Sequence, residues 1–386
     1  MWRKKYYQDP RRLALAAIAK ETKETTSTIA AGLPHLSPMN SEKLDLETLP
    51  DLDPTKCPRF RSPTDPSTSY GTTVRVFNQD SFDAAIGMPS VVLTIPASTP
   101  RTPTQAADAE ALDHLKASAA SPENLDSCTA ARVAVLNMAS ETKPGGGWLK
   151  GTSAQEEALC YRSTLAASLH RKLYPIAPRA GLYTRDVVVL RESHADGHSL
   201  MVPETDLREL PVLSALTVAG IRRPEVKGKA AGDVGVELAA TEPVTAEEKP
   251  RTVAALVEED AATETAELDE AGTNDARGKQ WKDGKNKGRR GPLVFADPAA
   301  RDLTKDKMRL CLRMAATKGH AMLVLGAIGC GAFGNPPHEI VACWSEVLGE
   351  SEFAGGWFKE IWFAVFDRRN EGNFEVFRDV FDGKVV

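Results

Sequence analysis

Residues 135–163 read VLNMASETKPGGGWLKGTSAQEEALCYRS, in which an apolar run, a glycine triplet and a helical segment follow one another. The apolar residues from Val133 to Met138 predict a buried strand, and the glycine triplet that follows predicts a turn. A helix is expected from about Ala154 to Lys172, with Ser153 and Glu156 spaced as a capping box at its start. A strand that passes through a glycine turn into a helix indicates an α/β protein.

The turn in this stretch carries residues suited to ligand binding and acid chemistry. Three consecutive glycines let the backbone lie against a ligand where any Cβ would collide. Glu156 and Glu157 are neighbours on the expected helix and point about 100° apart, because one helical turn takes ~3.6 residues. One of them can therefore do chemistry while the other caps the helix or holds a hydroxyl. On spacing alone, a structural turn with two solvated glutamates is an equal alternative.

A second glycine-rich segment lies near the C-terminus. Residues 322–337 read MLVLGAIGCGAFGNPP, in which Gly329, Gly331 and Gly334 form a G-x-G-x-x-G pattern between an apolar strand and a helix. Backbone N–H groups of such a loop can hold a diphosphate. The pattern also suggests an NAD-binding Rossmann fold, but prolines follow it and a single strand remains after it. Taken alone, the segment favours a tight loop with Phe333 in the core.

Further elements extend the α/β pattern on both sides of these segments. Apolar or alternating runs predict strands at Thr73–Phe77, Val91–Ile95, Val187–Leu190, Val212–Val218, Ala321–Ile328 and Ile361–Phe366. Helical spacing predicts helices at Arg11–Thr25, Ala106–Ala117, Pro337–Leu348 and Phe374–Phe381. The polar segment Pro34–Ser69 is expected to be a long surface loop. Strands that alternate with helices predict a mixed β-sheet sandwiched by helices.

Residues 225–291 do not fit this pattern. They contain few large apolar side chains, so burial cannot offset their ordering entropy, and a disordered insertion is expected. Their basic run KNKGRR is interpreted as a solvated charge patch in preference to a nuclear-import signal. The whole chain, 1–386, is then a single domain. Residues 1–130 supply accessory helices and the first strands, and residues 131–224 and 292–386 form the core.

The composition limits the class of protein. A net charge of −5 argues against sequence-independent capture of duplex nucleic acid. The six cysteines form no C-x-x-C pair, so a zinc ribbon is not expected, and a reduced intracellular compartment, cytoplasm or nucleus, is favoured. No apolar run approaches the roughly 20 residues that span a bilayer. His194 and His198 in HADGH are expected to lie in a surface turn that binds no metal.

The glycine triplet, seven intervening residues and the sequence QEE together resemble the signature of microbial-type poly(ADP-ribose) glycohydrolases. The flanking sequences LNMAS and EALCYRSTL resemble the same family, as do RRLALAAIAKET and TTVRVFNQDSFDAA nearer the N-terminus. The resemblance covers most of the chain outside residues 34–69 and 225–291. It implies a macrodomain-like fold and the hydrolysis of poly(ADP-ribose) to ADP-ribose, a reversal of ADP-ribosylation associated with the DNA damage response.

The resemblance also implies a mechanism that needs no metal or cofactor. Glu157 would protonate the leaving 2′-oxygen of the ribose–ribose bond, an oxocarbenium-like species would form, and the same carboxylate would activate water. Glu156 would hold ribose hydroxyls. Poly(ADP-ribose) and ADP-ribosylated proteins would be the partners. The implied substrate-binding residues are Ser140, Gly145, Gly146, Gly147, Gln155, Gly329, Gly331, Ala332, Phe333 and Gly334.

One residue departs from the pattern, and two alternatives remain. Macrodomains often have Asn where this chain has Ser140, whose shorter side chain reaches less far toward the distal ribose. A non-catalytic macrodomain that binds ADP-ribose is the first alternative, and the sequence from Gln155 to Glu157 argues against it because such a reader needs no acid. A Rossmann-type NAD-dependent oxidoreductase is the second.

Overall fold

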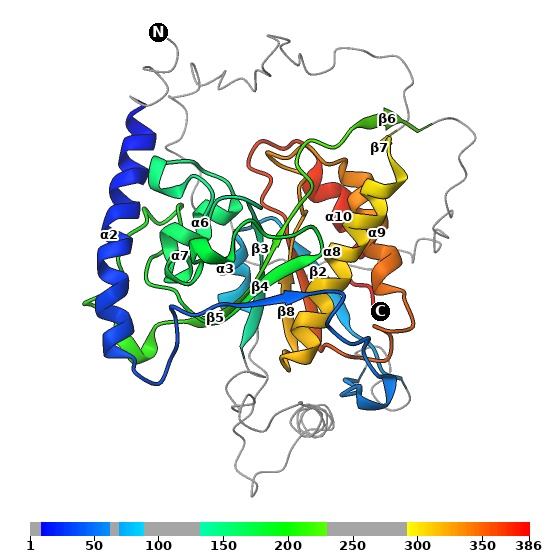
Figure 1. The fold of residues 1–386 in the computed structure, drawn as a ribbon, viewed down its shortest axis with the longest axis horizontal. Coiled ribbons are helices and arrows are strands. Elements are labelled where there is room, and N and C mark those ends of the chain that lie inside the picture. The colour runs from blue at the N-terminus through cyan, green and yellow to red at the C-terminus, as the bar shows by residue number, and fades with distance from the viewer. Residues whose placement is uncertain (1–8, 62–68, 89–131, 230–291) are drawn as a thin grey trace, which may run out of the picture. The chain divides into compact units, whose positions relative to one another are not determined.

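The centre of the molecule is a seven-stranded mixed β-sheet, seen in a computed structural model that describes residues 9–61, 69–88, 132–229 and 292–386 (Figure 1). The strand order is β1-β4-β5-β3-β8-β9-β2. Its strands are β1 (Glu42–Asp45), β2 (Thr73–Phe77), β3 (Val133–Ala139), β4 (Ala180–Val188), β5 (Val212–Ala219), β8 (Met322–Leu325) and β9 (Glu360–Ala364). Strands β5, β3, β8, β9 and β2 run parallel, so their carboxyl ends share one edge of the sheet.

The chain divides into two units, residues 1–227 with 292–386, and residues 228–291. The seven-stranded sheet and the helices that cover it belong to the first unit. A two-stranded ribbon of β6 (Val226–Gly228) and β7 (Leu293–Phe295) flanks the start and end of the second. The expected strand Val91–Ile95, the expected helix Ala106–Ala117 and nearly all of the expected insertion lie outside the described residues.

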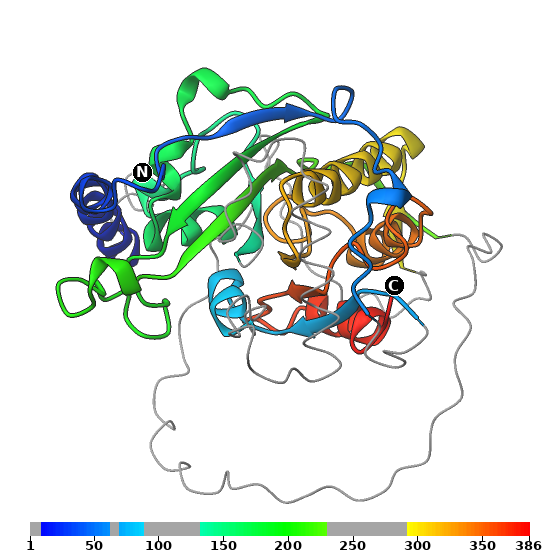
Figure 2. The same ribbon diagram turned by 90° about the horizontal axis from the view of Figure 1, so that it is seen from below.

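Helices cover both faces of the sheet, as the alternation of strands and helices predicts (Figures 1 and 2). One face carries α8 (Pro298–Thr317), α9 (Pro337–Leu348) and α10 (Asn373–Phe381). The other carries α2 (Pro10–Gly32), α3 (Ser81–Gly87), α6 (Gln155–Arg162) and α7 (Leu165–Ser168).

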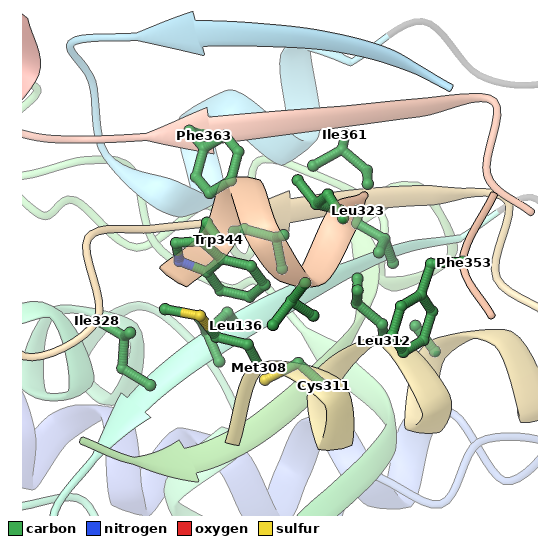
Figure 3. Close-up of a cluster of buried hydrophobic side chains, with 14 of the residues drawn as sticks. Leu136, Met308, Cys311, Leu312, Leu323, Ile328, Trp344, Phe353, Ile361 and Phe363 are labelled. Atoms are coloured by element: carbon green, nitrogen blue, oxygen red, sulfur yellow. The ribbon is translucent and has the colours of Figure 1, made fainter. Parts of the chain in front are cut away.

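Side-chain alternation along the strands separates two apolar cores. In β3, Ala134 and Leu136 pack with α8 and α9, whereas Val133 and Val135 pack with α3 and α6. Successive residues of a strand point to opposite faces, so one strand serves both cores. Figure 3 shows side chains from α8, α9 and β9 gathered around Leu136. Both faces of β3 are therefore buried, which leaves its carboxyl end as the place where it meets the surface.

Helix α8 was not predicted from the sequence. Its buried stripe contains Met308, Cys311, Leu312 and Ala315 at helical spacing, but charged residues interrupt the stripe and hide it. Asp297 caps the helix by accepting a hydrogen bond from the N–H of Ala299 at 2.9 Å, and a proline occupies the first turn. The short strand β1, inside the expected loop Pro34–Ser69, was also missed.

The helix expected from about Ala154 to Lys172 begins where predicted, at Gln155 after the N-cap Ala154, but the predicted end was wrong. Helix α6 ends at Arg162 because Ser163 is extended, with φ −148° and ψ 176°, and pairs with Val189. A turn of helix, α7, and a 3₁₀ turn at Arg171–Leu173 follow. The expected capping box is absent: Ala154 is the N-cap residue, and it makes no side-chain hydrogen bond.

Three expectations about the remaining segments can be compared with the structure. Residues 194–198 form a turn, as expected, in which His194 is exposed but His198 is buried. Among the described residues, no group of three or more His, Cys, Asp or Glu side chains is arranged to hold a metal ion. In the same part of the chain, no helix has the length and apolar character needed to cross a membrane.

Candidate active site

The glycine turn after β3 holds both glutamates of the QEE sequence. The N–H of Gly147 donates a hydrogen bond to Oε1 of Glu157 at 2.7 Å. The N–H of Ser140, the first residue after β3, donates to Oε2 of Glu156 at 2.7 Å. The carboxyl groups of Glu156 and Glu157 therefore point back toward the glycine turn, and neither caps the start of α6. The turn and the first turn of α6 form one hydrogen-bonded unit.

The glycines are required by these carboxylates as well as by any ligand. Gly145 and Gly146 have φ of +65° and +59°, a conformation that side chains disfavour. A Cβ on Gly146 would stand 2.5 Å from Oε1 of Glu157 and 3.1 Å from Oε2 of Glu156. Any residue larger than glycine at position 146 would therefore displace the acids. The spacing of residues in the sequence did not reveal this close approach of the two acids to Gly146.

Gln155 is part of the framework of the site. Its Nε2 donates to the carbonyl of Leu136 at 2.7 Å and to Oγ of Ser81 at 3.2 Å, while its Oε1 accepts from the N–H of Met138 at 2.9 Å. The amide thus fixes the start of α6 to the backbone of β3. These bonds already use both ends of the amide. The contact of Gln155 with substrate, which the family resemblance implies, stays a prediction.

Glu156 lies in a strongly desolvated position. Its side chain is buried, and this burial, with the negative charge of Glu157 adding to it, raises the pKa of Glu156 to about 8 against the opposing hydrogen bond from Ser140. Oε1 of Glu156 and Oδ1 of Asn137, on β3, are both buried without a well-formed hydrogen bond among the described residues. A buried carboxyl in this state carries a proton at neutral pH.

The second glycine loop follows β8 and is closed by Asn335. Nδ2 of Asn335 donates to the carbonyls of Ile221 at 2.7 Å and Gly329 at 3.1 Å. A Cβ on Gly329 would stand 2.3 Å from that Nδ2, and φ of Gly329 is +75°. The N–H of Arg223 donates to the carbonyl of Phe333 at 2.8 Å. These bonds tie the loop to the segment that follows β5.

Part of this loop is open. A Cβ on Gly331 or on Gly334 would meet no protein atom within 4 Å. Ala332 is exposed and Phe333 is half-buried. Within the described residues, Phe333 belongs to neither apolar core, so the alternative in which it fills the core is wrong. Open space beside glycines at the carboxyl edge of a parallel sheet is what a ligand-binding loop requires.

The two glycine turns lie at the same edge of the sheet. Strands β3 and β8 are adjacent and parallel, with Val133 opposite Met322 and Val135 opposite Val324, so both chains leave the sheet on the same side. The thioether of Met138 would be 3.2–3.4 Å from a Cβ on Gly326, which begins the second turn. Both turns therefore emerge at one edge of the sheet.

Phe366 was not recognised as a candidate from the sequence. It follows β9 at the same edge, and its side chain is 57% exposed. The run IWFAVF gives no sign of this, because Phe366 continues the unbroken apolar run of a buried strand. An exposed aromatic ring beside glycine turns can stack on a planar ligand group, which makes it an additional candidate for substrate contact.

Comparison with known proteins agrees with this geometry. Residues 62–192, 131 of the 386 in the chain, match the family model described as microbial-type PARG, catalytic domain. The resemblance to microbial-type poly(ADP-ribose) glycohydrolases is confirmed. No match was found among curated proteins. The PARG segment includes the glycine triplet, Gln155, Glu156 and Glu157.

Solved structures show the same fold. The crystal structure of poly(ADP-ribose) glycohydrolase from Thermomonospora curvata has a TM-score of 0.50 and 20% identity, and covers 95% of this chain and 99% of that one. A point mutant of the same enzyme has a TM-score of 0.51 at 20% identity, with 96% and 100% covered. The chain therefore has the PARG fold, a mostly parallel sheet between helices. Its strand order and antiparallel β4 differ from a Rossmann fold.

Proposed function

We propose that this protein hydrolyses the ribose–ribose O-glycosidic bonds of poly(ADP-ribose) and releases ADP-ribose, with Glu157 as general acid and base. The observation that carries the proposal is the hydrogen bond from Gly147 to Oε1 of Glu157 inside the QEE turn. It fixes a carboxyl group beside a glycine turn, at the edge where the second glycine loop also lies. The match to the PARG family supports the same reaction.

The chemistry needs a single carboxyl group. In the first step the bond between the anomeric carbon and the 2′-oxygen breaks, and Glu157 gives its proton to that oxygen. In the second step water adds to the oxocarbenium-like carbon, and Glu157 takes a proton from it. This differs from the usual glycosidase, in which two carboxyl groups divide these tasks. The bond from Gly147 limits the rotation of the carboxyl group, so the same residue can serve both steps.

The roles of the remaining residues follow from their positions. The loop Gly329–Gly334 presents open space and backbone N–H groups for the diphosphate, with Phe333 at its side. Gly145, Gly146 and Ser140 would line the distal ribose, and Glu156 would accept a hydrogen bond from a ribose hydroxyl or donate one to it. Gln155 supports the site through β3.

ADP-ribosylated proteins are the proposed partners, and the cytoplasm or nucleus is the proposed location. Cys57, Cys160, Cys311, Cys330 and Cys343 are free thiols, which fits a reducing compartment. The acidic net charge of the chain supports no role for duplex nucleic acid as a partner.

The test separates an enzyme from a reader. Purified protein is incubated with poly(ADP-ribosyl)ated protein, and released ADP-ribose is measured by chromatography, while binding of ADP-ribose is measured by calorimetry. The proposal expects both binding and release. Binding without release would support the non-catalytic reader, and tight binding of NAD without either would return attention to the oxidoreductase alternative.

A further inference from the structure

The N-terminal helix α2 packs directly against the loop that follows the glycine triplet (Figure 1). Gly151, with φ +71°, ends the 3₁₀ turn Trp148–Lys150. A Cβ on Gly151 would stand 2.0 Å from the carbonyl oxygen of Arg12 in α2. The helix backbone and the loop backbone therefore approach as closely as glycine permits, and the loop cannot move toward α2.

A side-chain contact continues from α2 to the turn that holds the acid. Nη2 of Arg12 donates to Oγ1 of Thr152 at 2.9 Å, and its Nε donates to the carbonyl of Lys150 at 3.5 Å. Oγ1 of Thr152 fills the space beside Gly147, where a Cβ would stand 2.3 Å from it. Gly147 in turn donates to Oε1 of Glu157. One chain of contacts thus joins Arg12 to the proposed catalytic carboxyl group.

The other end of α6 is held by the same helix. Oγ1 of Thr22 donates to the carbonyl of Tyr161 at 2.8 Å, and Nε of Arg191 donates to the same Oγ1 at 2.8 Å. Arg191 is only 2% exposed. The hydroxyl of Tyr161 donates to the carbonyl of Thr152 at 2.7 Å, which closes the loop onto α6. Helix α2 therefore contacts both the loop and the helix that carry the QEE turn.

We propose that α2 is a positioning element of the active site, and that Arg12, acting through the hydroxyl of Thr152, keeps the N–H of Gly147 directed at Glu157. The inference rests on the proposed function of Glu157. Arg12 is a positioning residue, since it touches the loop and contacts Glu157 through Thr152 and Gly147. Loss of this contact frees the loop, and the carboxyl group then samples orientations that do not favour proton transfer.

The expected effect is on turnover and not on binding. One hydrogen bond of this kind corresponds to about a threefold to tenfold change in kcat, with little change in KM. The loop Gly329–Gly334, which would hold the diphosphate, belongs to another part of the sheet edge. Affinity for ADP-ribose should therefore stay within about twofold of the original value.

The experiment compares two disrupting variants with two matched controls. Arg12→Ala removes the donor, and Thr152→Val removes the acceptor hydroxyl at nearly constant volume. Thr152→Ser keeps the hydroxyl, and Arg11→Ala removes an exposed neighbour on α2. Hydrogen exchange of the peptide that contains Gly147 is measured without substrate, followed by kcat and KM on poly(ADP-ribose) and the melting temperature.

The inference expects faster exchange at Gly147 and lower kcat in Arg12→Ala and Thr152→Val, with Thr152→Ser and Arg11→Ala close to the original protein. Unchanged exchange and kcat in both disrupting variants would overturn it. The inference would also be overturned if kcat fell and KM rose only in proportion to a lower melting temperature, because the contact would then be purely structural. The exchange measurement needs no catalysis, so it reports on α2 even if Glu157→Gln retains full activity and the proposed function fails.

Discussion

Glu156 and Glu157 are adjacent in one helical turn, yet their surroundings give them different properties. Glu156 receives the N–H of Ser140 and is buried with a raised pKa, while Glu157 receives the N–H of Gly147. The roughly 100° between neighbours on a helix separates the two carboxyl groups. At the scale of single residues, the site consists of a buried protonated carboxyl group beside the proposed acid and base.

The raised pKa of Glu156 predicts a pH-dependent stability. Its folded-state pKa of about 8 exceeds its ordinary value of 4.5, so between these values the folded protein holds a proton that the unfolded chain has released. The contribution of Glu156 to stability is therefore fully present below the ordinary pKa and falls as pH rises through this window, by at most about 1.4 kcal/mol per pH unit. Glu156→Gln removes this titration, so its free energy of unfolding should depend less on pH.

Urea unfolding at pH 5 and pH 8 measures this difference. The exposed Glu141→Gln is the matched control and should follow the original protein. Equal pH slopes for the original protein and Glu156→Gln would show that Glu156 does not hold its proton in the folded state.

A pair of glycine substitutions separates the two reasons for glycine at the site. Gly146→Ala places a methyl group against Glu157 at φ +59°, so it should abolish most activity and destabilise the fold by about 1–2 kcal/mol. Gly331→Ala meets open space and should keep the melting temperature, while weakening ADP-ribose binding. Calorimetry and thermal unfolding check both. Tight ADP-ribose binding by Gly331→Ala would remove Gly331 from the proposed diphosphate loop.

At the scale of elements, each glycine loop is fixed by one amide side chain, which is half-buried in Gln155 and buried in Asn335. Gln155 joins α6 to β3, and Asn335 joins the loop after β8 to the segment after β5. Both amides hydrogen-bond to backbone groups of the segments that they join. The loops are therefore rigid before any ligand arrives, which lowers the entropic cost of binding.

Asn335→Asp tests this rigidity. An aspartate cannot donate to the carbonyls of Ile221 and Gly329. The carbonyl of Gly329 keeps the backbone N–H of Asn335, but that of Ile221 loses its donor, so the protein should lose about 1–3 kcal/mol of stability, together with affinity for ADP-ribose. His338 is exposed and lies three residues after Asn335, so His338→Ala serves as the control and should change neither stability nor affinity. Unaltered melting temperature and affinity in Asn335→Asp would mean that the loop needs no such support.

The sequence predicted those elements whose pattern is local. Strand β2 at Thr73–Phe77 and helix α9 at Pro337–Leu348 have the predicted bounds, because alternation and a proline start define them. Helix α8 was missed because its stripe is interrupted by charges. The end of α6 at Arg162 depends on the pairing of Ser163 with Val189, a contact between distant residues that no local pattern reveals.

The candidate site was predicted only in part, because some of its features are local in sequence and others depend on distant contacts. Glycines and the QEE sequence are visible in the chain, so both loops and both acids were named. The bonds of Gln155 to β3, the clash that excludes a side chain at Gly146, and the exposure of Phe366 arise from tertiary packing. Such features follow from which strand lies next to which, and the spacing of residues does not contain that information.

At the scale of the whole molecule, the order of strands brings the parts of the site together. Strands β5, β3, β8 and β9 are neighbours and parallel, so the segments after each of them emerge at one edge. Helices on both faces bury the sheet, and α2 adds a support from outside it (Figure 2). The architecture therefore concentrates the glycine turns, Glu157 and Phe366 at a single rim.

The release of ADP-ribose from poly(ADP-ribosyl)ated protein by Glu157→Gln, compared with the original protein at equal concentration, tests this account most directly. Glutamine keeps the shape of the side chain and its bond from Gly147 but cannot give or take the proton. If Glu157 is the acid, release should fall by a factor of at least about 10², with ADP-ribose still bound. Release at the original rate would show that Glu157 is not the acid.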